Sequence, residues 1–445
     1  MGTGRARRWL RGVPAPMLLV LVYLVLMIAV CLALKLPIAA HGRIGWMDAL
    51  FTAASAATIN GLVVLDTGAD LTLFGQAVIL IAVQISGLGI MTFAVLILAA
   101  LGLPVGLTGR IFLRDDLNQP SVTRILRLVS TIFKTVLAFE ALGAAMLAAV
   151  FVPLTGWGTG LWHAVFHSVM AFNNAGFTTL PEGLIPLARD PLINLVIPVL
   201  AIIGGLGYAV LSDIFLLRKW RKFTLTTKLM LSGTAALLVI STLGFAVLEW
   251  ANPATLGAHD GVGARMMISW FQAVTTRSVG FNTVDIAALN DATTLMFMAL
   301  MMIGGGPTST AGGIKVTAFL VVLLATVMFF RRRTELTIFG RSMGDDQVLK
   351  VMALATVALL VAFAGMFLLV LTRQGEMLDI AFEVASALGS TGLSRGATWG
   401  LDGVGQAIVI VLMFAGRVGP LALGFFITTQ IAPRVRYPAG QIYLG

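Results

Sequence analysis

The stretch Phe51–Leu62 reads FTAASAATINGL, a short run of small and apolar residues that ends at a glycine. Three later stretches share this pattern, each opening on phenylalanine and closing on glycine followed by a bulky apolar residue. They are Phe166–Phe177 (FHSVMAFNNAGF), Phe271–Phe281 (FQAVTTRSVGF) and Phe382–Leu393 (FEVASALGSTGL). One such stretch in each quarter of the chain indicates internal duplication, with a period too long for a solenoid.

The composition around these stretches indicates a membrane protein. Of the 445 residues 58% are hydrophobic and only 11% are charged, against about 25% charged in ordinary globular proteins. So few charges cannot cover a soluble particle, and the excess apolar surface needs lipid. The single cysteine, Cys31, excludes an internal disulfide and a thiolate metal cluster. The composition therefore excludes a soluble enzyme and a secreted disulfide scaffold.

Eight long apolar runs predict eight transmembrane helices, since about 20 apolar residues suffice to cross a bilayer. The runs are Met17–Leu36, Leu73–Leu103, Leu126–Val152, Leu192–Leu217, Leu229–Trp250, Thr294–Phe330, Val348–Leu371 and Val404–Ile431. Four shorter apolar segments lie between the members of each pair, and their length fits re-entrant helices. They are Met47–Thr58, Leu161–Phe172, Met267–Thr276 and Leu378–Leu388.

Positive residues gather after every second long run, which accounts for the net charge of +10 better than nucleic-acid binding does. The clusters are Arg110/Arg114/Arg124/Arg127, Arg218/Lys219/Arg221/Lys222/Lys228, Arg331/Arg332/Arg333/Arg341 and Arg434/Arg436. By the positive-inside rule both termini are cytoplasmic. Each unit then crosses twice and returns to its starting side, so the units are parallel repeats. This argues against an inverted-repeat secondary transporter.

The predicted fold is an all-α polytopic membrane protein with four parallel helix–pore helix–helix repeats, arranged with pseudo-fourfold symmetry around one pore. The predicted boundaries are a cytoplasmic N-terminus over 1–14, repeats over 15–109, 110–222, 223–340 and 341–432, and a C-terminal tail over 433–445.

The glycine that closes each short segment predicts a selectivity filter. Non-helical backbone at membrane depth is tolerated where it is buried or lines a water-filled cavity. Glycine lets consecutive carbonyls point one way, and a ring of carbonyls can replace the hydration shell of a cation. A single glycine would favour mere close helix packing, but four in one register favour a filter. The predicted filter residues are Thr58, Ile59, Asn60, Gly61, Asn174, Ala175, Gly176, Ser278, Val279, Gly280, Ser390, Thr391 and Gly392.

A second glycine register predicts a kink or break in the long run after each filter stretch. The interruptions are Gly87–Gly89, Gly204–Gly207, Gly304–Pro307 and Gly416–Pro420. The third interruption belongs to residues 304–313, a stretch that cannot stay helical. We expect this stretch to form an irregular intramembrane loop below the filter. A nucleotide P-loop is excluded because Ile314 separates the last glycine from Lys315. The predicted gate residues are Gly304, Gly305, Gly306, Gly312, Gly313, Lys315 and Arg417.

Charged residues within the apolar runs need separate explanations. An unpaired arginine at mid-membrane costs at least about 2.5–3.5 kcal/mol, so Arg417 should face the pore and bond to carbonyls or hydroxyls of the 304–313 loop. Glu140, Asp213 and Glu383 form no paired-carboxylate or metal-binding pattern. We expect helix-end or pore-mouth charges at these three positions, and no enzyme.

In these motifs the chain resembles the Trk/Ktr/HKT superfamily of potassium transporters, closest to the Ktr-type membrane subunits. The resemblance covers essentially the whole chain. It rests most specifically on Asn173–Phe177 (NNAGF), Thr276–Phe281 (TRSVGF), Ser309–Lys315 (STAGGIK) and Gly416-Arg417. Asn60 departs from the hydroxyl or aliphatic residue of many relatives, and Gly306-Pro307 varies the start of the loop.

The resemblance implies potassium uptake across the bacterial cytoplasmic membrane, with potassium bound at Gly61, Gly176, Gly280 and Gly392. It implies no covalent cofactor, a homodimer, and a cytoplasmic nucleotide-binding regulatory ring of the RCK type. The tail Tyr437–Gly445 resembles the Ktr-type tail that packs in the dimer interface. Sodium as an activator stays open. The alternative is a sodium- or proton-coupled secondary transporter of another cation.

Overall fold

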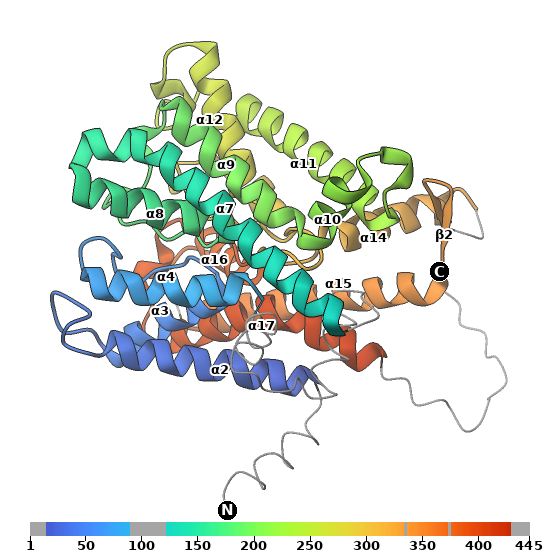
Figure 1. The fold of residues 1–445 in the computed structure, drawn as a ribbon, viewed down its shortest axis with the longest axis horizontal. Helices are drawn as coiled ribbons and strands as arrows, with labels where there is room; N and C mark the ends of the chain where they lie inside the picture. The colour runs from blue at the N-terminus through green and yellow to red at the C-terminus, as the bar shows by residue number, and fades with distance from the viewer. Residues whose placement is uncertain (1–14, 90–121, 333–335, 373–374, 429–445) are drawn as a thin grey trace, which may run out of the picture.

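The computed structural model describes residues 15–89, 122–332, 336–372 and 375–428. Long helices run roughly side by side along the long axis of the molecule (Figure 1). The N-terminal segment 1–14, the arginine clusters at 110–114 and 434–436, and the tail over 433–445 lie outside the described residues, as does the second half of the 73–103 run.

The first half of the chain forms two successive sets of helices. The first set is α2 (Ala15–Leu34), α3 (Trp46–Thr58) and α4 (Leu73–Gly87). The second set is α7 (Val122–Thr155), α8 (Trp157–Asn173), α9 (Pro191–Leu206) and α10 (Tyr208–Leu217). Short 3-10 turns η1 (Ile185–Leu187) and η2 (Trp220–Lys222) lie in the connections. Side chains cap these helices where the sequence supplies them: Thr72 caps α4 and Asp190 caps α9.

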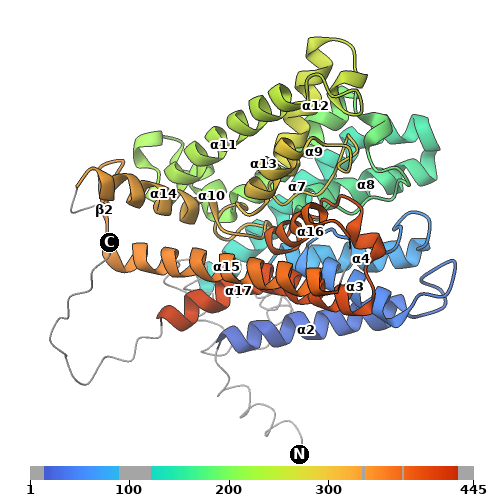
Figure 2. The same cartoon turned by 180° about the vertical axis from the view of Figure 1, so that it is seen from behind.

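The second half of the chain repeats this order and packs beside the first half (Figure 2). The third set is α11 (Leu225–Glu249), α12 (Val262–Thr275), α13 (Asp291–Met301) and α14 (Val316–Phe330). The fourth set is α15 (Asp345–Leu371), α16 (Met377–Gly389) and α17 (Gly403–Thr428). The 3-10 turns η3 (Leu256–Ala258) and η4 (Ala397–Gly400) complete the described helical elements. The short helices α3, α8, α12 and α16 are the four segments that the sequence pattern singled out.

One short β-hairpin departs from the all-α prediction. Strands β1 (Leu336–Ile338) and β2 (Arg341–Met343) pair antiparallel between α14 and α15. Phe339 and Gly340 both have positive φ, 49° and 74°, which is the backbone of a two-residue type I′ turn. The hairpin lies at one end of the long helices.

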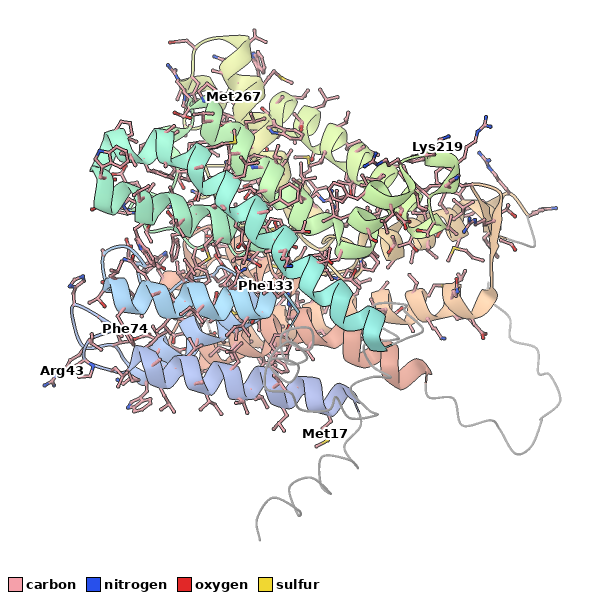
Figure 3. The ribbon with its side chains drawn as sticks, viewed as in Figure 1. Met17, Arg43, Phe74, Phe133, Lys219 and Met267 are labelled. Atoms are coloured by element: carbon pink, nitrogen blue, oxygen red, sulfur yellow. The ribbon has the colours of Figure 1, made fainter. Side chains whose placement is uncertain are left out.

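Within the part of the chain that the structure describes, three single helical segments are long and apolar enough to cross a membrane: Thr131–Thr155, Leu225–Glu249 and Asp346–Leu371. The pair α9 and α10 makes a fourth candidate, bent by 93° at its break. Only 11% of the most apolar 18-residue stretch of α15 is buried in the protein, so this helix presents apolar side chains outward. Figure 3 shows Arg43 and Lys219 at opposite ends of the molecule, with apolar side chains such as Phe74 and Phe133 between them.

Three of the four predicted interruptions coincide with a helix end. The helix α4 ends at Gly87, α9 turns into α10 at Gly207 (φ 90°), and residues 302–315 separate α13 from α14. At the fourth position the structure shows no break, because α17 continues through Gly416. A Cβ on Gly416 would lie 2.2 Å from the Leu388 carbonyl oxygen. This glycine therefore serves close packing of α17 against α16, which needs no change of backbone conformation.

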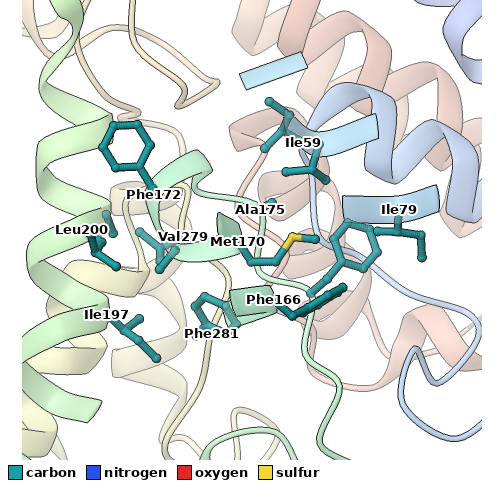
Figure 4. Packing of buried hydrophobic residues seen from close by; sticks show 14 of the residues in the cluster. Ile59, Ile79, Phe166, Met170, Phe172, Ala175, Ile197, Leu200, Val279 and Phe281 are labelled. Atoms are coloured by element: carbon teal, nitrogen blue, oxygen red, sulfur yellow. The ribbon is translucent and has the colours of Figure 1, made fainter. Parts of the chain in front are cut away.

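The largest apolar cluster surrounds α8, where side chains from the first three sets of helices pack together (Figure 4). Buried members are Phe166, Met170, Phe172, Ile197, Leu200, Val279 and Phe281. In lipid, such packing is stabilised by van der Waals contact more than by removal of apolar surface from water. The cluster holds the C-terminal end of α8 deep in the protein.

Candidate functional site

Each of the four short helices ends close to a residue with left-handed backbone, two positions before a predicted filter glycine. These residues are Ile59 (φ 56°), Asn174 (57°), Ser278 (62°) and Ser390 (49°). Residues other than glycine rarely adopt this conformation, and a β-branched residue such as Ile59 does so least readily. Four such residues in one register mark a backbone shape that the surrounding packing imposes.

The predicted filter glycines continue this shape. Gly61, Gly176, Gly280 and Gly392 have φ values of 92°, 69°, 83° and 87°. The residue between each glycine and the preceding left-handed position does not have positive φ. Alternation of this kind turns successive carbonyl groups toward the same side of the strand, so each strand can present several oxygens to one axis.

The four glycines close a ring in chain order. A Cβ on Gly61 would lie 2.5 Å from the Ala175 carbonyl oxygen, and one on Gly176 would lie 3.0 Å from that of Val279. The corresponding distances are 2.4 Å from Gly280 to Thr391 and 2.5 Å from Gly392 back to Asn60. Each strand therefore touches the carbonyl of the next strand, and a side chain at any of the four glycines would collide with backbone.

The polar side chains of the strands turn away from this ring. Asn60 Nδ2 donates to the Ala387 carbonyl (2.8 Å), and Ser278 Oγ donates to that of Gly389 (2.9 Å). Thr58 Oγ1 donates to its own helix at Ala54. The hydroxyls of Ser390 and Thr391 have no partner among the described residues. The side-chain donors of Thr58, Asn60 and Ser278 are thus satisfied by backbone carbonyls of the helices.

Two strands gain an extra bond at the glycine itself. Ser55 Oγ accepts the Gly61 N–H at 3.0 Å, and Ser386 Oγ accepts the Gly392 N–H at 3.1 Å. Both serines lie on the short helix of their own set, one turn before its end. This pairing fixes the glycine N–H to the helix and leaves its carbonyl free.

An open pocket of about 670 Å³ lies over the glycine ring. All four glycines line it, together with polar and apolar residues from the connections that follow them. Polar members are Asp66, Thr67, Thr178, Asn282, Ser394 and Trp399. The Asp66 carboxylate gives this pocket a negative charge, which suits the approach of a cation.

The predicted loop, residues 304–313, doubles back between α13 and α14. Its two ends pair with each other, since Gly304 N–H donates to Ile314 O (2.9 Å) and Ile314 N–H donates to Met302 O (3.1 Å). Gly306 N–H donates to the Gly205 carbonyl beside the α9–α10 break. A Cβ on Gly304 would lie 1.7 Å from the Gly312 carbonyl oxygen. Only glycine permits so close an approach of the two limbs.

The loop touches the filter strands directly. A Cβ on Gly312 would lie 2.3 Å from Ser390 Oγ, and the Asn174 side-chain amide lies 3.0 Å from Thr310 Oγ1. Arg277, beside Ser278, donates from Nη2 to the Gly304 carbonyl at 3.2 Å. The loop therefore contacts three of the four strands or their immediate neighbours.

The arginine of α17 reaches the loop, which is the contact expected from its position in an apolar run. Arg417 Nη1 donates to the Thr310 carbonyl, while Nη2 and Nε lie 3.4 Å from the Ser86 carbonyl and the Tyr23 hydroxyl. Lys315 Nζ donates to the Ala311 carbonyl at 2.7 Å. The predicted gate residues thus form one connected group.

The expectation for two intramembrane acids is wrong. Glu140 is buried within α7, where it accepts hydrogen bonds at 3.1 Å from Gln84 and Asn173. Glu383 is buried within α16. Asp213 accepts from the hydroxyls of Thr224 and Thr227 at the start of α11, as a helix-end charge does. Buried carboxylates with donors on neighbouring segments are structural anchors that sequence spacing cannot reveal.

Thr310 and Arg277 are the residues of this site that the sequence analysis missed. Thr310 is fully buried and contacts α8 through the Phe172 carbonyl, as well as Arg417. Arg277 is mostly buried against the loop. The signal was present in the motif TRSVGF, because a cation directly before a filter strand needs a partner within the membrane.

Comparisons with known proteins show the family to which the chain belongs. A family of cation transport proteins, TrkH, matches residues 18–431. The chain is 42% identical to the Ktr system potassium uptake protein B of Bacillus subtilis, over 98% of each chain. It is 36% identical to the protein of that name from Vibrio alginolyticus, over 97% of this chain and 95% of the other. It is 33% identical to the potassium/sodium uptake protein NtpJ of Enterococcus hirae, over 90% of each.

The fold also matches a solved structure. The crystal structure of the potassium transporter TrkH from Vibrio parahaemolyticus superposes with a TM-score of 0.72 at 20% identity, covering 93% of this chain and 84% of the other. These relatives are membrane transporters. The chain belongs to the TrkH family of cation transport proteins, which confirms the resemblance that its motifs predicted.

Proposed function

We propose that the chain takes up potassium across the bacterial cytoplasmic membrane as a channel-like transporter. The observation that carries the proposal is the closed ring of contacts between each glycine and the carbonyl of the next strand. Carbonyl oxygens around one axis can replace the hydration shell of a potassium ion. The names of the two Ktr relatives point to the same ion.

In this proposal each set of helices crosses the membrane twice with a re-entrant pore helix between the crossings. The four units give eight spans and place both termini in the cytoplasm. The repeated order of long and short helices supports this, and so does the positive-inside pattern of the sequence. The ends of α3, α8, α12 and α16 aim their negative dipole ends at the ring, which favours a bound cation.

The intramembrane loop is the proposed gate. It touches the strands next to Ser390 and Asn174 and is bonded to Arg417, which sits where a cation leaving the filter would pass. A fixed positive charge there opposes permeation until the loop and arginine move. A homodimer with a cytoplasmic nucleotide-binding ring of the RCK type would supply that movement, and sodium would serve as an activator.

Potassium and sodium uptake in a potassium-transport-deficient bacterium tests the function, with and without a cognate cytoplasmic subunit. Rescue of growth at low potassium is the expected result. Flux in liposomes then separates the alternative: passive potassium flux down its gradient supports a channel-like pathway. Flux strictly coupled to sodium or protons would contradict it and support a coupled transporter of another cation.

A further inference from the structure

The four filter strands share one backbone shape, but the side chains of the short helices that lie beside them differ from strand to strand. We call the three residues after each glycine the outer limb: residues 62–64, 177–179, 281–283 and 393–395. The residue directly after the phenylalanine that opens each stretch points toward its own outer limb in three of the four cases. These positions hold Thr52, His167, Gln272 and Glu383, all essentially buried.

In the second strand, His167 bonds at both ring nitrogens. Nδ1 lies 2.7 Å from the His163 carbonyl oxygen, so it carries the proton and donates. In that neutral tautomer Nε2 accepts from the Thr178 hydroxyl at 2.9 Å. His163 Nδ1 lies 2.6 Å from Thr179 Oγ1 and adds a second attachment. Two imidazoles on one helix face therefore hold two residues of this limb.

In the fourth strand the same two register positions are used by carboxylates. Glu383 accepts from the Ser394 hydroxyl (2.6 Å), from the Arg395 backbone N–H (3.1 Å) and from the Thr398 hydroxyl. Asp379, at the register of His163, forms an ion pair with Arg395 at 2.6 Å. Hydrogen bonds to a charged acceptor are about twice as strong as neutral ones.

From this register the third strand has one attachment, in addition to a hydrogen bond that Thr275 Oγ1 donates to the Phe281 carbonyl, and the first strand has none. The Gln272 amide lies 3.1 Å from Thr283 Oγ1 and, with its oxygen toward the strand, accepts the Thr283 N–H at 2.8 Å. The Thr52 hydroxyl has no partner among the residues that the structure describes. Val63, in the first outer limb, has no polar side chain to which Thr52 could bond. Asp48, at the register of His163, accepts instead from Gln406 on α17.

We propose that His167, Gln272 and Glu383 are positioning residues that brace the outer limbs of strands two, three and four. Ser55 fixes the glycine of the first strand, but residues 62–64 have no such brace, so this outer limb is then the part of the filter that deforms most easily. This inference rests on the proposed filter, because a brace matters for ion choice only if the ring it supports coordinates the ion. The braces fix the spacing of the carbonyls, so their loss lets the ring shrink around the smaller sodium ion.

Matched substitutions at this one register test the proposal in the full chain, reconstituted in liposomes. Glu383→Leu, Gln272→Leu and His167→Leu remove a brace, whereas Thr52→Val removes a hydroxyl that holds nothing. One neutral hydrogen bond corresponds to roughly a factor of five in an equilibrium. We expect the potassium-to-sodium flux ratio to fall about tenfold for Glu383→Leu and about threefold to fivefold for the other two. Thr52→Val should stay within twofold of the wild type.

Substitutions on the strand side keep the test valid if a leucine variant does not fold. Ser394→Ala and Thr178→Val remove the partner of a brace from partly exposed positions. Glu383→Gln retains an acceptor and should fall between wild type and Glu383→Leu. Unchanged ratios in folded Ser394→Ala and Glu383→Leu proteins would overturn the proposal, and so would an equal loss in Thr52→Val.

Two further measurements separate the braces from the filter. Gly392→Ser is measured in parallel: if it changes the ratio while the brace variants do not, the braces fail and the filter stands. If Gly392→Ser also leaves the ratio unchanged, the filter assignment itself fails. Hydrogen–deuterium exchange of the wild type gives an independent readout. Backbone amides in residues 62–64 should exchange faster than those in the three braced limbs, and equal rates would contradict a deformable first strand.

Discussion

The filter strands and the 304–313 loop are both glycine-rich, non-helical segments placed among apolar helices, yet they are held very differently. Each strand begins at a helix end, contacts the next strand and closes a ring. The loop leaves α13, returns on itself and is attached to its surroundings by a few separate bonds, among them those to Arg277 and Arg417. Glycine therefore permits close contact between strands of one ring in the first region, and in the second it permits close contact between the two limbs of one loop.

The largest expected effect comes from placing a side chain in the ring. In Gly61→Ser the new Cβ meets the Ala175 carbonyl at 2.5 Å, on a backbone of φ 92° that L-residues rarely adopt. We expect the potassium-to-sodium uptake ratio to fall by about tenfold or more, because strain of about 1–3 kcal/mol displaces a coordinating carbonyl. Gly158→Ser is the control, since a Cβ there meets nothing within 4 Å. Unchanged selectivity for Gly→Ser at all four ring positions would contradict the filter.

The next effect concerns the arginine that joins α17 to the loop. Arg417→Ala removes both the positive charge and the bond to the Thr310 carbonyl, so potassium uptake should rise about tenfold, because a hydrogen bond from a charged group is worth at least about 1.5 kcal/mol. Arg417→Lys keeps the charge but loses the planar multidentate bonding, and should fall between wild type and alanine. Arg43→Ala, in an exposed connection, is the control. Equal or lower uptake in folded Arg417→Ala protein would make this arginine structural.

A smaller effect is expected from the loop backbone. Shortening the loop by two residues between Gly304 and Gly313 should raise basal potassium flux about threefold and weaken the dependence on a regulatory subunit. The reason is that a shorter loop cannot keep its contacts with Ser390 and Asn174 at once. Thermal stability close to that of the wild type is the control for folding. Normal low basal flux in such a protein would refute the gate.

The smallest expected effect lies away from both regions, in the connection after α11. Partial burial and the nearby Arg189 and Arg265 lower the pKa of His259, against a weaker raising effect of Asp260. The unfolded chain therefore takes up a proton first as pH falls, and stability is lost as pH drops through the ordinary histidine range. The melting temperature of wild type should fall by about 1 °C more than that of His259→Gln between pH 7.5 and 5.5. Potassium flux should respond equally in both proteins.

The two regions also differ in how far sequence could predict them. The sequence predicted the shared register of Gly61, Gly176, Gly280 and Gly392, because a backbone with positive φ favours glycine. Isoleucine rarely has positive φ, so the strained backbone at Ile59 could not be predicted from its residue type. It follows only from the packing around it. The loop could be predicted from its composition. The contacts of Thr310 could not, because they join segments far apart in sequence. Gly416 shows the limit of composition, since a glycine that permits close packing looks the same as one that breaks a helix.

The order of contacts in the ring has a consequence for biosynthesis. The ring follows chain order from Gly61 to Gly392, and its last contact joins Gly392 to Asn60, whose side chain also donates to Ala387. The first quarter of the protein is synthesised and inserted long before its partner in the last quarter exists. Until then the packing that imposes the backbone shape of its strand is incomplete, and Gly392 is not there to contact the Asn60 carbonyl. Folding of the pore therefore ends with a contact of very high sequence separation, the kind that forms slowly, so the first quarter is the part of the nascent chain most exposed to misassembly.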